Sequence, residues 1–201
     1  MDWEFIVHHL ISGYIPVSAA LGLYFMFLHV FGKRQTAARI IASFVFCFYL
    51  TGILSLTGIC FRGSFSPSIV WIPFVYMITG PLHTVLNILL FVPMGVFLPL
   101  LYREFNGITR TAAAGFTVSL SVEIAQMFGT GTTDINDLIT NTLGACIGYV
   151  IFKMMHKTVL KSQIDEIRSA GIPCFPEFPL FWAGSLLIML TVQTVIYHAL
   201  F

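Results

Sequence analysis

Long apolar runs separated by short polar segments dominate the pattern of this chain. A helix needs about 20 mostly apolar residues to cross a bilayer. By that measure the chain is predicted to form six membrane-spanning helices. They cover residues 13–31, 40–59, 83–101, 111–128, 135–152 and 180–201. The sequence therefore predicts an all-α, polytopic membrane helix bundle, with residues 1–201 forming a single integral membrane domain.

The composition supports a membrane protein and excludes an ordinary soluble domain. Of the 201 residues, 57% are hydrophobic and 9% are charged, and the mean hydropathy is +0.89. Soluble domains carry about 25% charged residues. The net charge is +1 and no run of Lys and Arg occurs, so nucleic-acid binding is not expected. The four cysteines show no metal-ligand spacing.

The basic residues predict how the helices are oriented. Nine of the ten Lys and Arg residues fall between spans one and two, three and four, or five and six. They are Lys33, Arg34, Arg39, Arg103, Arg110, Lys153, Lys157, Lys161 and Arg168. Because Lys and Arg accumulate in cytoplasmic loops, both termini are predicted to lie outside. Arg62 is then the one basic residue on the outer side.

Two further segments are predicted to lie at the membrane surfaces. Residues 62–80 on the outer side contain Trp71-Ile-Pro-Phe74, which is too short and broken to span. They are predicted to form a re-entrant or interfacial segment, with an aromatic-rich loop as the alternative. On the inner side, residues 153–168 carry basic residues on one helical face, and Ile164 and Ile167 on another. This pattern predicts an amphipathic helix resting on anionic lipid.

The fourth span carries the first candidate for a functional carboxylate. Helical spacing places Ser119, Glu123 and Gln126 on one face near its outer end. A carboxylate in a membrane span is costly and marks a functional site by default. Glu123 is interpreted as a general acid/base or a cation ligand. The alternative is a carboxylate that joins helices by hydrogen bonds to Gln126 or Asn141.

The fifth span begins with further acidic residues. Asp134, Asp137 and Asn141 share one helical face. Thr133 or Asp134 could instead cap the helix, with Asp137 near the positive end of its dipole. If both aspartates face Glu123, the acidic cluster is predicted to bind a divalent cation, share a proton or pair with an arginine.

The third span adds two polar residues and the fifth adds a packing motif. His83 and Asn87 lie four apart at the outer start of the third span. His83 is interpreted as a proton carrier and Asn87 as a polar ligand, with interfacial filling as the alternative for His83. Gly144 and Gly148 are spaced to let another helix approach the fifth span closely.

Four blocks of sequence together resemble the VanZ-like family of bacterial membrane proteins. They are Trp71-Ile-Pro-Phe74, Asn87-Ile-Leu-Leu-Phe91-Val-Pro93-Met-Gly95, Ser119 through Glu123-Ile-Ala-Gln126, and Asp134-Ile-Asn-Asp137-Leu-Ile-Thr-Asn141-Thr-Leu-Gly144. The resemblance covers residues 70–149 and implies a multi-pass protein of the bacterial cytoplasmic membrane. The family's namesake is associated with low-level resistance to teicoplanin, a lipoglycopeptide that acts on cell-wall precursors outside the membrane.

This chain departs from the usual family motif at two positions. The family has an Arg where Gly131 stands, and often an Asp where Asn136 stands. The missing Arg leaves the acidic cluster less neutralised, so we hypothesise that a divalent cation takes its place. No other cofactor is predicted.

These residues support two hypotheses about function. In the first, the protein binds or modifies an outer-leaflet cell-envelope lipid or a lipid-linked cell-wall precursor. The residues assigned to catalysis are Glu123, Asp137 and Asp134, and those assigned to substrate binding are Asn87, Gln126, Asn141, His83 and Arg62. In the second, the protein is a small transporter or a non-enzymatic partner of envelope enzymes, and the polar cluster only holds helices together. An ion or proton pathway is a weaker third hypothesis, because the inner halves of the spans lack a matching line of ionisable residues.

Overall fold

The computed structural model describes residues 3–59, 69–70, 80–128, 133–157, 161–169 and 176–200. This part of the chain forms seven α-helices, one 3-10 turn and two short strands. The helices are α1 (Trp3–Val30), α2 (Ala37–Leu56), α4 (Pro81–Leu101), α5 (Ile108–Gln126), α6 (Ile135–Lys157), α7 (Lys161–Ser169) and α8 (Glu177–Leu200). The 3-10 turn is η1 (Arg103–Phe105), and the strands are β1 (Ile69–Val70) and β2 (Thr133–Asp134). The predicted all-α helix bundle is therefore confirmed.

The lengths and apolar character of the helices suit a membrane. Among the described residues, α1, α2, α4, α6 and α8 are long and apolar enough to cross one. They coincide with five of the six predicted spans. Helix α5 coincides with the remaining span, but its Thr, Ser, Glu and Gln residues make it less apolar and it does not belong to this set. The number of spans and the outward termini remain predictions.

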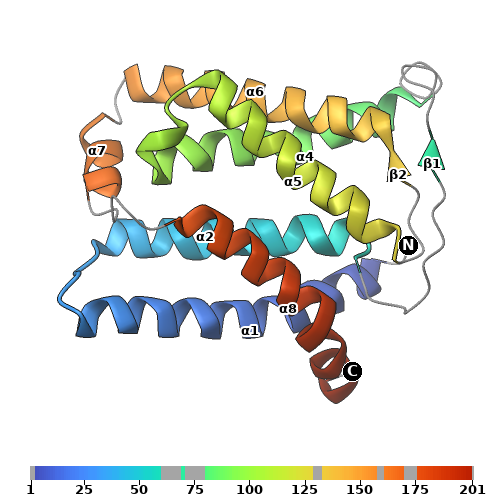
Figure 1. Ribbon diagram of the computed structural model, residues 1–201, viewed down its shortest axis with the longest axis horizontal. Helices are drawn as coiled ribbons and strands as arrows, with labels where there is room; N and C mark the ends of the chain where they lie inside the picture. The colour runs from blue at the N-terminus through green and yellow to red at the C-terminus, as the bar shows by residue number, and fades with distance from the viewer. Residues whose placement is uncertain are drawn as a thin grey trace.

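The helices form two groups that lie against each other (Figure 1). Helices α4, α5 and α6 pack together on one side, and α1, α2 and α8 pack together on the other. Hydrogen bonds between side chains and backbone connect the two groups. Tyr49 on α2 donates to the Leu90 carbonyl on α4 at 2.6 Å. Gln126 at the end of α5 donates to the Thr57 carbonyl after α2 at 3.1 Å.

Helices α4 and α6 approach each other closely because glycines line their contact. A Cβ atom on Gly148 would overlap the Val92 carbonyl oxygen of α4. A Cβ atom on Gly95 of α4 would overlap the Ala145 carbonyl oxygen of α6. The close approach predicted from Gly144 and Gly148 is confirmed, and it fixes the positions of the polar residues at the ends of both helices.

One end of the bundle gathers the described basic residues. The α1–α2 and α4–α5 connections and the C-terminal end of α6 lie at this end, beside α7 (Figure 1). We call it the basic end, because all nine Lys and Arg residues of the described chain belong to these two connections and their flanking helical turns, to the end of α6, or to α7. The described basic residues therefore gather at one end of the bundle, as the sequence predicts.

Arg39 and Glu177 form a buried ion pair at the basic end that the sequence pattern does not predict. Their side chains are 1% and 3% exposed. Arg39 also donates to the carbonyl oxygens of Leu101 at 2.7 Å and Ile167 at 3.3 Å. The Tyr24 hydroxyl donates to the Glu177 carboxylate at 2.6 Å. This cluster therefore connects α1, α2, α4, α7 and α8.

The amphipathic segment predicted over residues 153–168 divides between the end of α6 and the short helix α7. On α7, Ile164 is buried. Arg168 is buried as well, and its Nε donates to the Pro99 carbonyl at 2.7 Å. This face of α7 thus packs against the bundle, and the contact with anionic lipid remains a prediction.

Candidate functional site

The candidate site lies at the end of the bundle opposite the basic end, where β2 joins α5 to α6 (Figure 1). Strand β1 pairs with β2 in parallel, Ile69 opposite Thr133 and Val70 opposite Asp134. This pairing places Val70, from the chain between α2 and α4, beside Asp134. Arg62 and the rest of the predicted interfacial segment, residues 62–68 and 71–79, lie outside the described residues.

Glu123 connects the last turn of α5 to β2 by hydrogen bonds. Its side chain is 2% exposed. The carboxylate oxygen Oε2 accepts a hydrogen bond from the Asp134 backbone N–H at 2.9 Å. The Thr133 hydroxyl donates to the Glu123 backbone carbonyl at 3.1 Å. A general acid or base must reach the proton that it transfers, so this enclosed geometry favours a positioning role.

Asp134 caps the start of α6. Its Oδ1 accepts from the Asn136 backbone N–H at 2.8 Å and from the Asn136 side-chain amide at 2.7 Å. The first of these is the hydrogen bond of an N-cap, made to the second residue of the helix, as the capping alternative predicts. Asp134 thereby contributes to the helix start that orients the next acidic residue.

Asp137, Asn87 and His83 come together across α4 and α6, as the hypothesis of a polar site predicts. The Asn87 amide donates to Asp137 Oδ1 at 2.6 Å. His83 Nδ1 lies 4.0 Å from the same oxygen and 3.4 Å from the Asn87 amide nitrogen. Asp137 is 22% exposed and His83 is 71% exposed. We call these three residues the polar cluster.

The polar cluster contains acceptor oxygens that are available to a ligand. In the part of the chain that the structure describes, Asp137 Oδ2 and Asn87 Oδ1 make no hydrogen bond. Both sit on side chains that are not fully buried. The cluster can therefore accept hydrogen bonds from hydroxyl or ammonium groups of a ligand.

The other predicted ligand residues lie inside helix contacts. Asn141 is buried, and its amide donates to the Ser119 hydroxyl of α5 at 2.9 Å. Gln126 joins α5 to the end of α2 through its bond to the Thr57 carbonyl. Their acceptor oxygens, Asn141 Oδ1 and Gln126 Oε1, are buried without a partner among the described residues. These positions favour helix packing over direct contact with a ligand.

The three carboxylates interact without forming a metal site in this region. The negative charges of Asp134 and Asp137 both act on Glu123. Nevertheless, the described residues contain no group of three or more His, Cys, Asp or Glu side chains that could hold a metal ion. The divalent cation therefore remains a prediction, without a ligand set in the described chain.

Comparison with known proteins places this arrangement in a family. The VanZ/LLP1 family model matches residues 17–156. The chain is also 32% identical over 82 residues to Protein VanZ of Enterococcus faecium. The aligned residues cover 40% of this chain and 50% of that protein. The chain thus spans about half the length of this curated relative. No solved structure matches it. Because the family match covers most of the chain and includes the whole polar cluster, the protein belongs to the VanZ/LLP1 family.

Proposed function

We propose that this protein contributes to resistance against teicoplanin-type lipoglycopeptides by binding the polar headgroup of an outer-leaflet cell-envelope lipid or lipid-linked precursor. Membership of the VanZ/LLP1 family and the similarity to Protein VanZ support the link to resistance. The polar cluster supports the binding of a headgroup. The single observation that carries the proposal is the partly exposed Asp137 carboxylate. It accepts a hydrogen bond of 2.6 Å from the Asn87 side-chain amide and lies beside the exposed His83.

The charge distribution indicates which headgroup chemistry fits. The charged residues described at this end of the bundle are Glu4, Glu123, Asp134 and Asp137, and all are acidic. The nine described basic residues belong to the opposite end. A negative potential repels a phosphate and attracts ammonium groups, while the free acceptor oxygens suit sugar hydroxyls. A headgroup that carries both hydroxyl groups and a free amino group meets both requirements.

Binding fits the geometry better than chemical modification does. Glu123 is enclosed and bonded to the backbone of β2, so it positions β2 and the start of α6. Asp137 lies in the first turn of that helix. In this proposal Glu123 and Asp134 hold Asp137 in place, and Asp137 with Asn87 contacts the ligand.

A second candidate function rests on the internal hydrogen bonds. Asn141 bonds to Ser119 across α5 and α6, and Glu123 bonds to Asp134. If Asp137 and Asn87 serve only the same purpose, the polar residues stabilise the bundle. The protein would then act as a small transporter or as a membrane partner of cell-envelope enzymes.

The substitution Asp137→Asn separates the two functions. Asparagine keeps an acceptor oxygen for Asn87 and removes the negative charge. We expect the teicoplanin concentration that stops growth to fall to that of cells without the protein, at normal membrane abundance and melting temperature. The matched control is Asp165→Asn on α7, a half-exposed residue at the basic end, which should preserve resistance. Lower abundance or a lower melting temperature would favour the structural function, and unchanged resistance would refute the binding proposal.

A further inference from the structure

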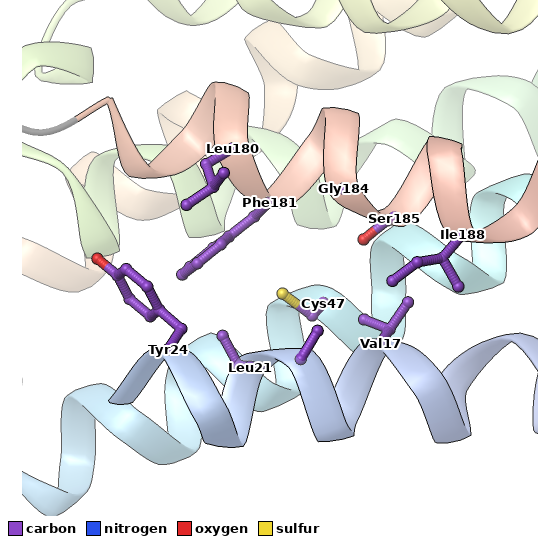
Figure 2. Close-up of a pocket in the computed structure, with 10 residues that line it drawn as sticks. Val17, Leu21, Tyr24, Cys47, Leu180, Phe181, Gly184, Ser185 and Ile188 are labelled. Carbon is purple, nitrogen blue, oxygen red and sulfur yellow. The ribbon is translucent and has the colours of Figure 1, made fainter. Parts of the chain in front are cut away.

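A cavity of about 160 Å³ lies between α1, α2 and α8, in the group of helices that does not carry the polar cluster (Figure 2). Its floor is formed by buried side chains, among them Leu21, Cys47 and Phe181. Its rim includes Ala20 and Leu180, which are exposed. The cavity is therefore a cleft that opens on the outer surface of the bundle, between α1 and α8.

The surroundings of the cleft are hydrocarbon when the protein is in a membrane. Both α1 and α8 are long and apolar enough to span one, and the cleft lies within their length. Large apolar side chains elsewhere on the same two helices, such as Leu23 and Leu187, are exposed, which suits helices surrounded by lipid. The molecules that meet the mouth of the cleft are thus lipid chains.

One hydroxyl group points into the cleft, and it is compatible with a hydrocarbon occupant. Ser185 is buried, and its Oγ has no hydrogen-bond partner among the described residues; Figure 2 shows it directed toward α1 and α2. A serine in a helix can donate to the carbonyl four residues earlier, which is that of Phe181. Thr51 and Ser55 on α2 already do so, each at 2.9 Å. A molecule bound in the cleft therefore need not supply a hydrogen-bond acceptor for the Ser185 hydroxyl.

The position of the cleft along α1 links it to exposed basic residues. Tyr24 lines the end of the cleft nearer the basic end and Val17 the other. At 1.5 Å per residue, these lie about 9 Å and 20 Å from Val30, the last residue of α1. Lys33 and Arg34 follow and are exposed. One leaflet has about 15 Å of hydrocarbon. When a lipid headgroup lies at Lys33 and Arg34, the half of its acyl chain that is farther from the headgroup therefore reaches the cleft.

We propose that this cleft binds one acyl chain of an anionic phospholipid from the leaflet at the basic end, with the phosphate at Lys33 and Arg34. The apolar lining selects a hydrocarbon chain, and the two exposed cations select a negative headgroup. The bound lipid fills a gap between α1 and α8 that side chains leave open. This site is separate from the polar cluster and does not depend on the function proposed for it.

Two glycines provide a matched pair of variants. Gly184 lines the cleft, and a Cβ atom added there would meet nothing within 4 Å. The same is true of Gly22 on α1, which does not line the cleft. Gly184→Leu therefore fills the cleft, whereas Gly22→Leu adds the same side chain elsewhere on a helix. Both variants are expected to fold, because leucine also favours helix more than glycine does.

The test measures lipid binding to purified protein in detergent by native mass spectrometry, with the melting temperature followed in parallel. The probes are phosphatidylglycerol and phosphatidylcholine with identical chains. Wild type and Gly22→Leu should bind phosphatidylglycerol about ten-fold more tightly than phosphatidylcholine, and their melting temperatures should rise with it. Gly184→Leu should lose both the bound lipid and the rise. Ala20→Leu fills the cleft from α1 and replaces Gly184→Leu if that variant does not accumulate.

The headgroup is tested separately from the chain. The double variant Lys33→Gln, Arg34→Gln should bind both phospholipids with equal affinity, because the preference comes from the two cations. Wild-type-like binding of phosphatidylglycerol by Gly184→Leu would overturn the proposal. Equal binding of the two phospholipids by the wild type would overturn it as well.

Discussion

The hydrogen bond between the Glu123 carboxylate and the Asp134 backbone N–H predicts a large loss of stability for one substitution of Glu123 and a small loss for another. Glu123→Gln keeps an acceptor oxygen for that N–H and removes the charge, so its cost should stay below about 1 kcal/mol. Glu123→Ala removes the acceptor and leaves a gap at a residue that is 2% exposed. Hydrogen bonds to charged groups contribute about 1.5–3 kcal/mol, and that is the expected loss of stability.

The melting temperature of the purified protein in detergent measures this difference. For a chain of 201 residues, each kcal/mol corresponds to about 2–4 °C. Glu123→Ala should therefore melt about 3–12 °C below wild type, and Glu123→Gln less than about 4 °C below it. Release of β2 also displaces the first turn of α6, so Glu123→Ala should lower teicoplanin resistance while Glu123→Gln retains it.

Two results would refute this reasoning. If Glu123→Ala melts with the wild type, the bond to Asp134 does not hold β2 in place. If Glu123→Gln loses resistance at normal abundance and melting temperature, the negative charge itself takes part in the function. The second result would restore Glu123 as a general acid/base, which typically contributes about 10²–10⁴-fold in rate.

Three further predictions concern packing, charge and metal. Gly148→Leu forces α4 and α6 apart, so it should lower the stability of the folded protein by at least about 1–3 kcal/mol and reduce its abundance in the membrane. The control Gly22→Leu should accumulate normally, and equal abundance of the two variants would contradict the close contact. Arg39→Gln leaves Glu177 charged in a buried site and should cost about 3–5 kcal/mol, and adding Glu177→Gln should recover part of the melting temperature. If the predicted divalent cation binds at the acidic cluster, calcium or magnesium should raise the melting temperature of wild type in a saturable way; no effect on the melting temperature would refute that prediction.

The sequence predicted the helices because long apolar runs leave few alternatives in a membrane. It also predicted the close α4–α6 contact from Gly144 and Gly148, since small residues spaced by four are typical of such contacts. That Asp137 and Asn87 lie at the same end of the bundle followed from the positions of both residues near the predicted outer ends of their spans, whereas the hydrogen bond between them did not follow from the sequence. These features depend on local periodicity, which one sequence is enough to show.

Other features depend on contacts between distant segments, which periodicity does not show. The predicted second and sixth spans begin at residues 40 and 180, which makes Arg39 a loop charge and leaves Glu177 without a role. Two ionisable residues of opposite charge, each just before an apolar run, were the available signal. The pairing of β1 with β2 was also missed, because strands of two residues leave no alternating pattern.

The ion pair between Arg39 and Glu177 has a consequence for biosynthesis. The two residues are 138 positions apart, and a ribosome adding about 5–20 residues per second needs roughly 7–28 s to bridge them. During that interval Arg39 is in place at the membrane without its carboxylate partner, and a lone charge there is costly. Insertion of α8 is therefore the step that completes the bundle. A nascent chain that stalls before Glu177 would leave Arg39 without the carboxylate that pairs with it in the finished bundle.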